Sequence, residues 1–365
     1  MKTGKKRLII SLAVVALLFA AAVIVEHTCG SKSMVVTVLQ KGAVYALIAV
    51  SMNLLNGFTG LFSLGQAGFM LVGAYSYAIL TIPMAKRAAV YQYYDGGIVQ
   101  FTVGMLPALL VAGVVAALFA ALIGMPVLRL KGDYLAIATL GFAEIVRAFI
   151  QWDAIGPLTN GSNLLKTYPT LKTVMPGNTL LFTFLVVGVC IGLILLLINS
   201  TYGRAFKAIR DDEIAAEAMG INLFHHKQMA FVISSFFAGI GGGLYGALLG
   251  TVDPKNFLFT ITYNFLLIIV LGGMGSVTGS MFGAIIVTAG LEYLRLFDEP
   301  LELMGVAIPL FRPGLRMVVF SILLMVCVLF WRHGIMGTRE LTWDKIINFV
   351  KHPLDSFRKK GVQRK

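Results

Sequence analysis

The sequence predicts an all-α, polytopic integral membrane protein with about ten transmembrane helices. Of its 365 residues, 58% are hydrophobic and 13% are charged, and the mean hydropathy is +0.85. Soluble domains carry about 25% charged residues. Apolar runs of about 18 residues or more recur along the chain, a length that a membrane span requires and a soluble core helix does not. Two Gly-rich stretches, 57–60 and 272–275, interrupt this pattern and predict two broken helix regions.

Ten apolar runs define the expected helices. The first follows a basic segment, and we expect residues 1–33 to keep this helix rather than lose it as a signal peptide. The eighth run has only about 11 residues, too few to cross about 30 Å of hydrocarbon at 1.5 Å per residue. In order, the runs are Leu8–Val25, Val35–Leu55, Leu61–Ile82, Phe101–Gly124, Tyr134–Trp152, Leu180–Ile198, Met229–Leu249, Ile261–Leu271, Val277–Leu296 and Leu315–Trp331.

The basic residues predict the orientation. An even number of spans puts both termini on one side, and with the N-terminus inside, the inner segments hold 19 of the 30 Lys and Arg residues. These segments are 1–7, 125–133, 199–228 and 332–365. Because cytoplasmic loops carry an excess of Lys and Arg, we expect cytoplasmic termini in a bacterial cytoplasmic membrane. The net charge of +13 then reports topology rather than nucleic-acid binding.

The longest polar connection between apolar runs is Ser200–Lys227. Acidic residues at Asp211–Glu213 suit a helix N-terminus, and Gly220 stands where a helix would end. We therefore expect a short helix on the cytoplasmic surface. From composition alone, this segment is either a solvated connection or a docking surface for a soluble partner.

The two Gly-rich breaks are candidates for a translocation path. Irregular backbone at membrane depth is tolerated only where it is buried in protein or lines a water-filled cavity. Such breaks mark substrate sites in many transporters, although glycines also simply allow close helix packing. We expect the residues at the breaks to line or border the path. They are Gly57, Thr59, Gly60, Ser63, Gln66, Gly272, Gly275, Ser276 and Thr278.

Two charged residues lie inside the fifth run. Glu144 and Arg147 are three positions apart and so share one helix face. An ionisable residue within the membrane is a functional candidate, and a proton site at Glu144 would suit a self-contained secondary carrier. The alternative is an intramembrane ion pair that neutralises itself and faces the bundle.

The sequence shows no signature of an enzyme. No GxxxxGK[ST] sequence occurs, so ATP and Mg²⁺ would have to bind to partner subunits. The three cysteines are far apart and predict no metal site. The GxGxxG pattern at 241–246 lies in an apolar run rather than after a strand, which predicts close helix packing instead of a dinucleotide site.

Four segments resemble the LivH/LivM-type permeases, the membrane subunits of bacterial ABC importers for branched-chain amino acids. Their order and spacing are more similar to LivM than to LivH, and the resemblance covers residues 34–335, followed by a basic tail at 336–365. The outer stretch LTNGSNLL (158–165) departs from the Gly-rich form usual in the family. The four segments are NGFTGLFSLGQAGFMLVGAY (56–75), LRLKGDYLAIATLGFAEIVR (128–147), GRAFKAIRDDEIAAEAMGIN (203–222) and VLGGMGSVTGSMFGA (270–284).

The resemblance implies uptake of leucine, isoleucine and valine driven by ATP. It implies a LivH-like permease partner, two cytoplasmic ABC ATPase subunits and an extracytoplasmic substrate-binding protein. Related permeases move urea or short amides, and the motifs do not separate these substrates. The resemblance also implies that segment 200–227 couples to the ATPase. The residues expected to do so are Arg204, Arg210, Asp211, Glu213, Ala216, Glu217 and Gly220.

Overall fold

A computed structural model describes most of the chain. The described residues are 19–28, 30, 33–295, 302–303, 306–307, 315–330, 334–337 and 340. They are helical or irregular apart from one antiparallel pair of two-residue strands, β1 (Glu302–Leu303) and β2 (Val306–Ala307), so the all-α prediction is confirmed. The expected basic segment at the N-terminus and most of the expected basic tail lie outside the described residues.

Four described helices are long and apolar enough to cross a membrane. They are α2 (Met34–Asn53) with its π-helical extension η1 (Leu54–Phe58), α5 (Met105–Val127), α9 (Thr179–Asn199) and α12 (Leu223–Leu249). A fifth candidate joins α6 (Asp133–Gln151) to η2 (Asp153–Ile155) and α7 (Gly156–Thr159) through a bend of 61°. The expected count of ten is therefore not confirmed for the described residues.

Four expected spans are present as shorter helices of 14 to 17 residues. They are α3 (Gln66–Thr81), α13 (Phe259–Gly272), α14 (Val277–Tyr293) and α15 (Leu315–Phe330). The two breaks explain the short length of α3, α13 and α14. Irregular backbone replaces the expected start of α3 at the first break, and the second break separates α13 from α14. The π-helical turn lengthens α2 at the same point, three residues beyond the predicted run.

Helix α12 lies in the centre of the bundle and packs against α3, α5 and α2. A Cβ atom at Gly73 of α3 would fall 2.0 Å from the carbonyl oxygen of Gly239, and one at Gly242 would fall 2.1 Å from that of Met70. The backbones of α3 and α12 therefore touch directly. The close packing predicted for the Gly-rich pattern at 241–246 is confirmed.

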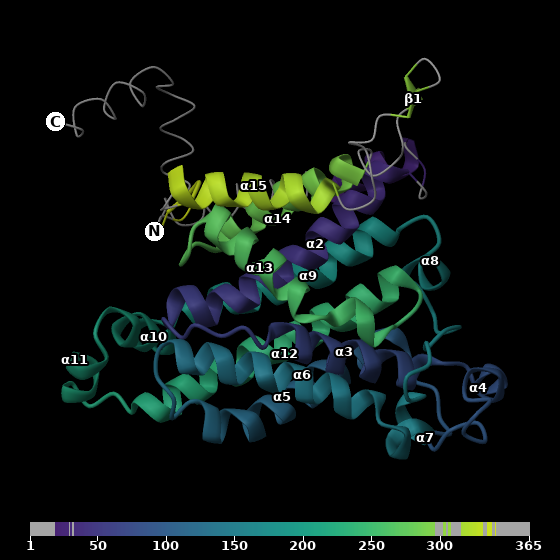
Figure 1. The fold of residues 1–365 in the computed structure, drawn as a ribbon, viewed down its shortest axis with the longest axis horizontal. Coiled ribbons are helices and arrows are strands. Elements are labelled where there is room, and N and C mark those ends of the chain that lie inside the picture. The colour runs from purple at the N-terminus through teal and green to yellow at the C-terminus, as the bar shows by residue number, and fades with distance from the viewer. Residues whose placement is uncertain are drawn as a thin grey trace, which may run out of the picture.

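The helix axes run in a common direction and leave short elements at two opposite ends of the bundle (Figure 1). At one end, α10 (Thr201–Asp211) and α11 (Glu213–Ala218) project beyond α9 and α12. At the other end lie α4 (Met84–Val90), α7 and α8 (Leu171–Val174). We refer to them as the α10–α11 end and the α4–α7 end.

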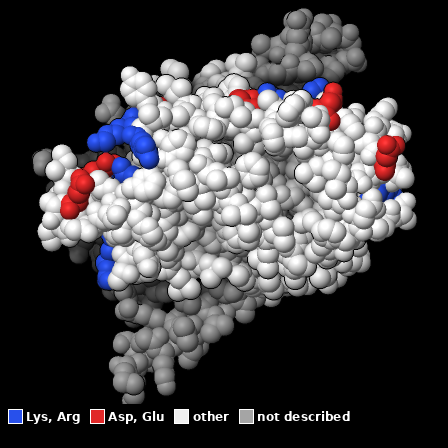
Figure 2. Space-filling model, turned by 90° about the horizontal axis from the view of Figure 1, so that it is seen from below, with Lys and Arg blue, Asp and Glu red and all other residues white. Residues whose placement is uncertain are grey.

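The surface between the two ends is apolar. Figure 2 shows one face on which charged residues gather at the left and right ends and along the upper edge, around a broad uncharged area. Exposed side chains on α5 and α9 include Leu118, Leu122, Leu193 and Leu196, with exposed fractions of 52 to 71%. This arrangement supports a membrane protein, because leucines exposed to this degree on long helices are stable in hydrocarbon.

The stretch 83–100, which separates two of the expected apolar runs, contains the helix α4. Arg87 at its centre is 3% exposed and points back into the bundle. Its guanidinium group donates to the carbonyl oxygens of Ile79 at 3.0 Å and Phe101 at 2.6 Å, and also to that of Val99. These bonds tie α4 to both flanking segments, a long-range constraint that local turn residues do not reveal.

Candidate functional site

The first break follows α2. The hydroxyl of Thr59 donates to the carbonyl oxygen of Leu54 at 2.9 Å, which closes the π-helical turn η1. The irregular stretch up to α3 is held by Asn56, whose side chain bonds both the carbonyl oxygen and the N–H of Ser63, at 3.3 and 3.2 Å. These side chains therefore pair backbone groups of Leu54 and Ser63 within the protein.

The second break separates α13 from α14. Gly273 and Gly275 have φ values of 118° and 85°, so the chain turns sharply between the two helices. Ser276 is the N-cap of α14 and accepts a hydrogen bond from the N–H of Gly279 at 3.0 Å. The second break is thus a tight turn that ends at a capped helix N-terminus.

Asn53 joins the two breaks. Its amide oxygen accepts from the N–H of Gly275 at 2.9 Å, and its amide nitrogen donates to the carbonyl oxygen of Ser276 at 3.0 Å and the hydroxyl of Ser280 at 2.8 Å. A Cβ atom at Gly57 would lie 2.5 Å from the nitrogen of Gly275, so the backbones meet without room for a side chain. We call this meeting of the two breaks the junction.

The α10–α11 end reaches the junction through Arg210. Its Nη1 atom donates to the carbonyl oxygen of Gly57 at 3.2 Å, and its Nη2 atom lies 2.8 Å from the carboxylate of Asp211. Lys207, one turn earlier on α10, lies over the ring of Phe58 at 5.7 Å. Helix α10 is therefore attached to the first break by two cations, and a shift of α10 would be transmitted to the break.

Residues 334–337 and Glu340 cover the second break. The N–H groups of Ile335 and Met336 donate to the carbonyl oxygens of Leu271 and Gly272 at 2.7 and 3.1 Å. The carboxylate of Glu340 accepts from the N–H of Val277 at 2.6 Å, the N–H of Thr278 at 3.2 Å and the Thr278 hydroxyl at 2.7 Å. Glu340 therefore places a negative charge at the N-terminus of α14, where the helix dipole stabilises it.

The polar residues expected along a path are placed inside the protein. Thr59, Ser63, Gln66 and Ser276 are each at most 4% exposed. Gln66 donates to the hydroxyl of Ser51 at 2.7 Å, which links the start of α3 to α2. In the conformation described, these groups bond to the protein and not to an open channel.

A cavity of about 270 Å³ lies between the junction and α10. Of the residues expected at the breaks, Gly275 borders it, and Arg210 and Glu340 lie on its wall. The other lining residues are Phe58, Leu195, Ile198, Asn199 and Lys207.

The short helix expected in segment 200–227 is α11. Asp212 caps it by accepting from the N–H groups of Ile214 and Ala215 at 2.9 and 3.1 Å. Gly220 follows the helix with φ of 85°, a left-handed conformation that favours glycine. The preceding helix α10 was not expected, although Phe206 and Ile209 are buried at a helical spacing that would have indicated it.

One of the residues expected to couple to the ATPase is buried on α11. Ala216 is 4% exposed, because it packs against its own chain, so it is not on the exposed face. The exposed apolar side chains are instead Ile214 and Met219, at 82 and 84%. Glu213 is also engaged within the chain, in a salt bridge of 2.7 Å to Lys227.

The remaining expected residues are placed as follows. Arg204 and Glu217 are exposed on α10 and α11. Gly60 lies against Arg210, since a Cβ atom there would be 3.0 Å from the Arg210 Cγ atom. Glu144 and Arg147 form a salt bridge of 2.6 Å on α6, each about a quarter exposed.

Asn53, Ser280 and Glu340 take part in the site and were not expected from the sequence. The signal for Asn53 was present, because a lone amide at the end of an apolar run needs partners at membrane depth. Glu340 gave no such signal, since it lies in a polar stretch far along the chain.

Comparison with known proteins places the chain in a family. Residues 34–329 match the family described as branched-chain amino acid transport system / permease component. The permease protein LivM of the high-affinity branched-chain amino acid transport system of Escherichia coli K12 is 34% identical over 284 residues, which cover 70% of this chain and 62% of LivM. The LivM protein of Salmonella typhimurium LT2 gives the same identity and coverage.

The LivH permease protein of Escherichia coli K12 is less similar. It is 25% identical over 255 residues, covering 67% of this chain and 80% of LivH. No solved structure matches the chain. The chain spans 62% of the length of these two LivM proteins. Because the family match extends over residues 34–329, the chain belongs to the family of permease components of branched-chain amino acid transport systems.

Proposed function

We propose that the chain is a permease subunit of an ATP-driven importer that carries leucine, isoleucine and valine across the bacterial cytoplasmic membrane. Family membership over residues 34–329 is the observation that carries this proposal. The structure supports it in one further respect, because Arg210 connects the surface helix α10 to the junction of the two breaks. A motor that acts on α10 from outside the membrane would therefore act on the breaks.

The proposal includes partners. A LivH-like permease completes the membrane part, and two cytoplasmic ABC ATPases bind ATP and Mg²⁺. An extracytoplasmic binding protein delivers the substrate. The family match supports these partners, and a GxxxxGK[ST] sequence, which would bind ATP, does not occur in the printed sequence.

We also propose ten membrane-spanning segments, one for each apolar run, with both termini in the cytoplasm. Reporter fusions after Lys365 and near Leu165 should then report opposite sides of the membrane. Matching sides would exclude this topology.

Uptake by the reconstituted importer tests the substrate. Proteoliposomes that hold the complete complex should accumulate leucine, isoleucine and valine but not urea, and only with ATP inside. Preferential uptake of urea would favour the amide importers of the same family. Uptake without ATP would indicate a secondary carrier, although the salt bridge between Glu144 and Arg147 argues against a proton site at Glu144.

Docking of the ATPase is tested at the exposed residues of α11. Ile214→Asp and Met219→Asp place a charge where we expect apolar contact, while the N-cap and Ala216 remain in place. We expect loss of ATPase co-purification and of uptake, with unchanged helix content. Ile98→Asp is a matched control, because Ile98 is 70% exposed at the α4–α7 end. Full ATPase binding by the α11 variants would show that the partner docks elsewhere.

A further inference from the structure

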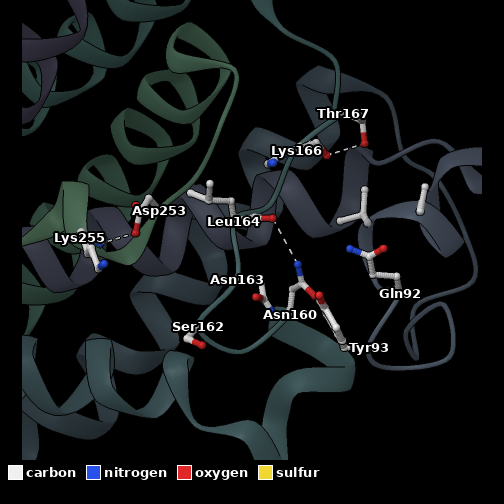
Figure 3. Close-up of a pocket in the computed structure, with 12 residues that line it drawn as sticks. Gln92, Tyr93, Asn160, Ser162, Asn163, Leu164, Lys166, Thr167, Asp253 and Lys255 are labelled. Atoms are coloured by element: carbon white, nitrogen blue, oxygen red, sulfur yellow. Dashed lines mark hydrogen bonds between the residues drawn. The ribbon is translucent and has the colours of Figure 1, made fainter.

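A second cavity lies at the α4–α7 end, away from the junction. Its volume is about 480 Å³, within the range of about 300–1,000 Å³ typical of small-molecule sites. Three separate segments surround it: the end of α4 with Gln92 and Tyr93, the loop 160–167, and the turn that carries Asp253 and Lys255 (Figure 3). On the proposed orientation, this cavity opens to the outside of the cell.

The wall of the cavity is fixed by hydrogen bonds. Leu165 and Val252 exchange two backbone hydrogen bonds of 3.1 and 3.0 Å, which join the loop 160–167 to the turn before η3 (Pro254–Phe257). The Tyr91 hydroxyl donates to the carbonyl oxygen of Leu158 at 3.0 Å and so ties the end of α4 to α7, the helix that leads into the loop 160–167. Burial raises the pKa of Tyr91 to about 12, so this donor keeps its proton at physiological pH. The three segments therefore form one preformed recess.

One acceptor in the wall lacks a partner. Asn160 is 1% exposed and adopts a left-handed conformation with φ of 66°. Its amide nitrogen donates to the carbonyl oxygen of Leu164 at 3.2 Å, but its buried amide oxygen has no hydrogen-bond partner among the described residues. Buried polar atoms are almost always paired, so we expect this oxygen to accept a hydrogen bond from a bound group.

The cavity also carries charges of both signs. Lys166 and Lys255 are exposed on its wall. Asp253 is partly buried, and its carboxylate accepts a hydrogen bond from the backbone N–H of Lys255 at 2.9 Å. Apolar surface is supplied by Val90 and Leu164. A ligand that matches this wall has a carboxylate for the lysines, a cationic donor for Asp253 and Asn160, and an aliphatic part.

We propose that this cavity is a reception site for a free zwitterionic amino acid with an aliphatic side chain. The site would hold the substrate at the outer end before it reaches the junction. This inference rests on the proposed import of branched-chain amino acids, and it adds a place and a set of contacts for the substrate. The competing use of the recess is to receive side chains of the binding protein, and the test separates the two.

The test uses a cysteine inside the cavity. Ser162 is exposed and lines the cavity, so Ser162→Cys should react with a membrane-impermeant thiol reagent in proteoliposomes that hold the importer without its binding protein. L-Leucine should slow this reaction, whereas leucinamide, which lacks the carboxylate, and isocaproate, which lacks the ammonium group, should not. Thr173→Cys, exposed on α8 outside the cavity, is the control and should react equally with and without leucine.

Two further variants identify the contacts. Lys166→Gln and Asp253→Asn, each combined with Ser162→Cys, should raise the half-protecting leucine concentration about tenfold or more, since a hydrogen bond to a charged group is lost. Lys172→Gln, at an exposed lysine on α8, should leave it unchanged. Equal protection by leucinamide, or protection only when the binding protein is added, would overturn the proposal.

The same proteoliposomes separate this inference from the proposed function. With binding protein and ATP supplied, uptake of leucine tests the importer itself. Uptake without thiol protection would overturn the reception site and leave the proposed function intact. Absence of uptake of leucine, isoleucine and valine would overturn the proposed function.

Discussion

At the junction, segments that are far apart in the sequence satisfy one another's hydrogen bonds, whereas at the α4–α7 end polar side chains surround a cavity of about 480 Å³. Asn53 uses both its amide oxygen and its amide nitrogen within the protein. Asn160, also buried, uses only its nitrogen. The two asparagines have the same chemistry and nearly the same burial, but only one is fully paired.

This difference separates two tasks that polar groups perform in a membrane protein. A fully paired, buried group holds two broken helices in one geometry, because each unpaired buried polar group would cost several kcal/mol. A polar group that lines a recess at the end of the bundle can use part of its hydrogen-bonding capacity for a ligand or for water. We therefore expect substitutions at the junction to affect folding and those at the α4–α7 end to affect binding.

Asn53→Leu tests the junction and should have the largest effect. It leaves the N–H of Gly275 buried without its acceptor and removes two further bonds, so we expect a loss of about 3 kcal/mol in stability and loss of uptake. The thermal unfolding midpoint of the purified complex in detergent measures this. The matched control is Asn178→Leu, because Asn178 is exposed and makes no capping bond at α9. Equal midpoints for the two variants would show that the junction is not held by Asn53.

The sequence predicted the helices well where local signals determine them. Helix α11 begins after its acidic N-cap and ends before Gly220, as the residues indicated, and most apolar runs match a helix within a few residues. The sequence could not predict that Ala216 faces its own chain. A helix of six residues has no periodic pattern, and which face is covered depends on contacts with segments distant in the sequence.

The same limit applies to the site. The Gly-rich stretches marked both breaks, but nothing local showed that they meet at Asn53 or that Arg210 reaches Gly57, 153 positions away. The polar residues at the breaks were expected beside a path, and whether they line one in another conformation stays a prediction. Their actual partners, such as Ser51 for Gln66 and Leu54 for Thr59, are set by the folded arrangement of the helices.

Glu340→Gln tests whether the segment that carries Glu340 belongs to the junction. The amide has one acceptor oxygen where the carboxylate has two, so it removes the charge at the N-terminus of α14 and leaves either the Val277 or the Thr278 N–H without its acceptor; we expect a loss of about 2 kcal/mol. Amide hydrogen exchange at Val277 and Thr278 should become faster. Asp95→Asn, the same change in an exposed turn, is the control. Unchanged exchange in the Glu340 variant would place this segment outside the junction.

Asn160→Ala probes the wall of the cavity and should have a smaller, conformational effect. Alanine in the left-handed conformation of Asn160 costs about 1–2 kcal/mol, whereas glycine adopts it freely. Both substitutions remove the bond to Leu164, so Asn160→Gly is the matched control. We expect the alanine variant to be about 1 kcal/mol less stable than the glycine variant, and therefore to have the lower thermal unfolding midpoint. Equal midpoints would mean that the loop relaxes and that the recess is not preformed.

Lys166→Gln and Asp253→Asn should have the smallest effect on stability, within about 0.5 kcal/mol of the wild type. Lys166 is exposed, so its charge has little effect on folding, and asparagine caps η3 about as well as Asp253 does. Thermal midpoints measured beside those of Asn53→Leu would show the contrast between the two ends directly. A loss of more than about 1 kcal/mol in either variant would mean that these charges hold the fold as Asn53 does. The α4–α7 end would then be a second structural network, and its open cavity would no longer distinguish it from the junction.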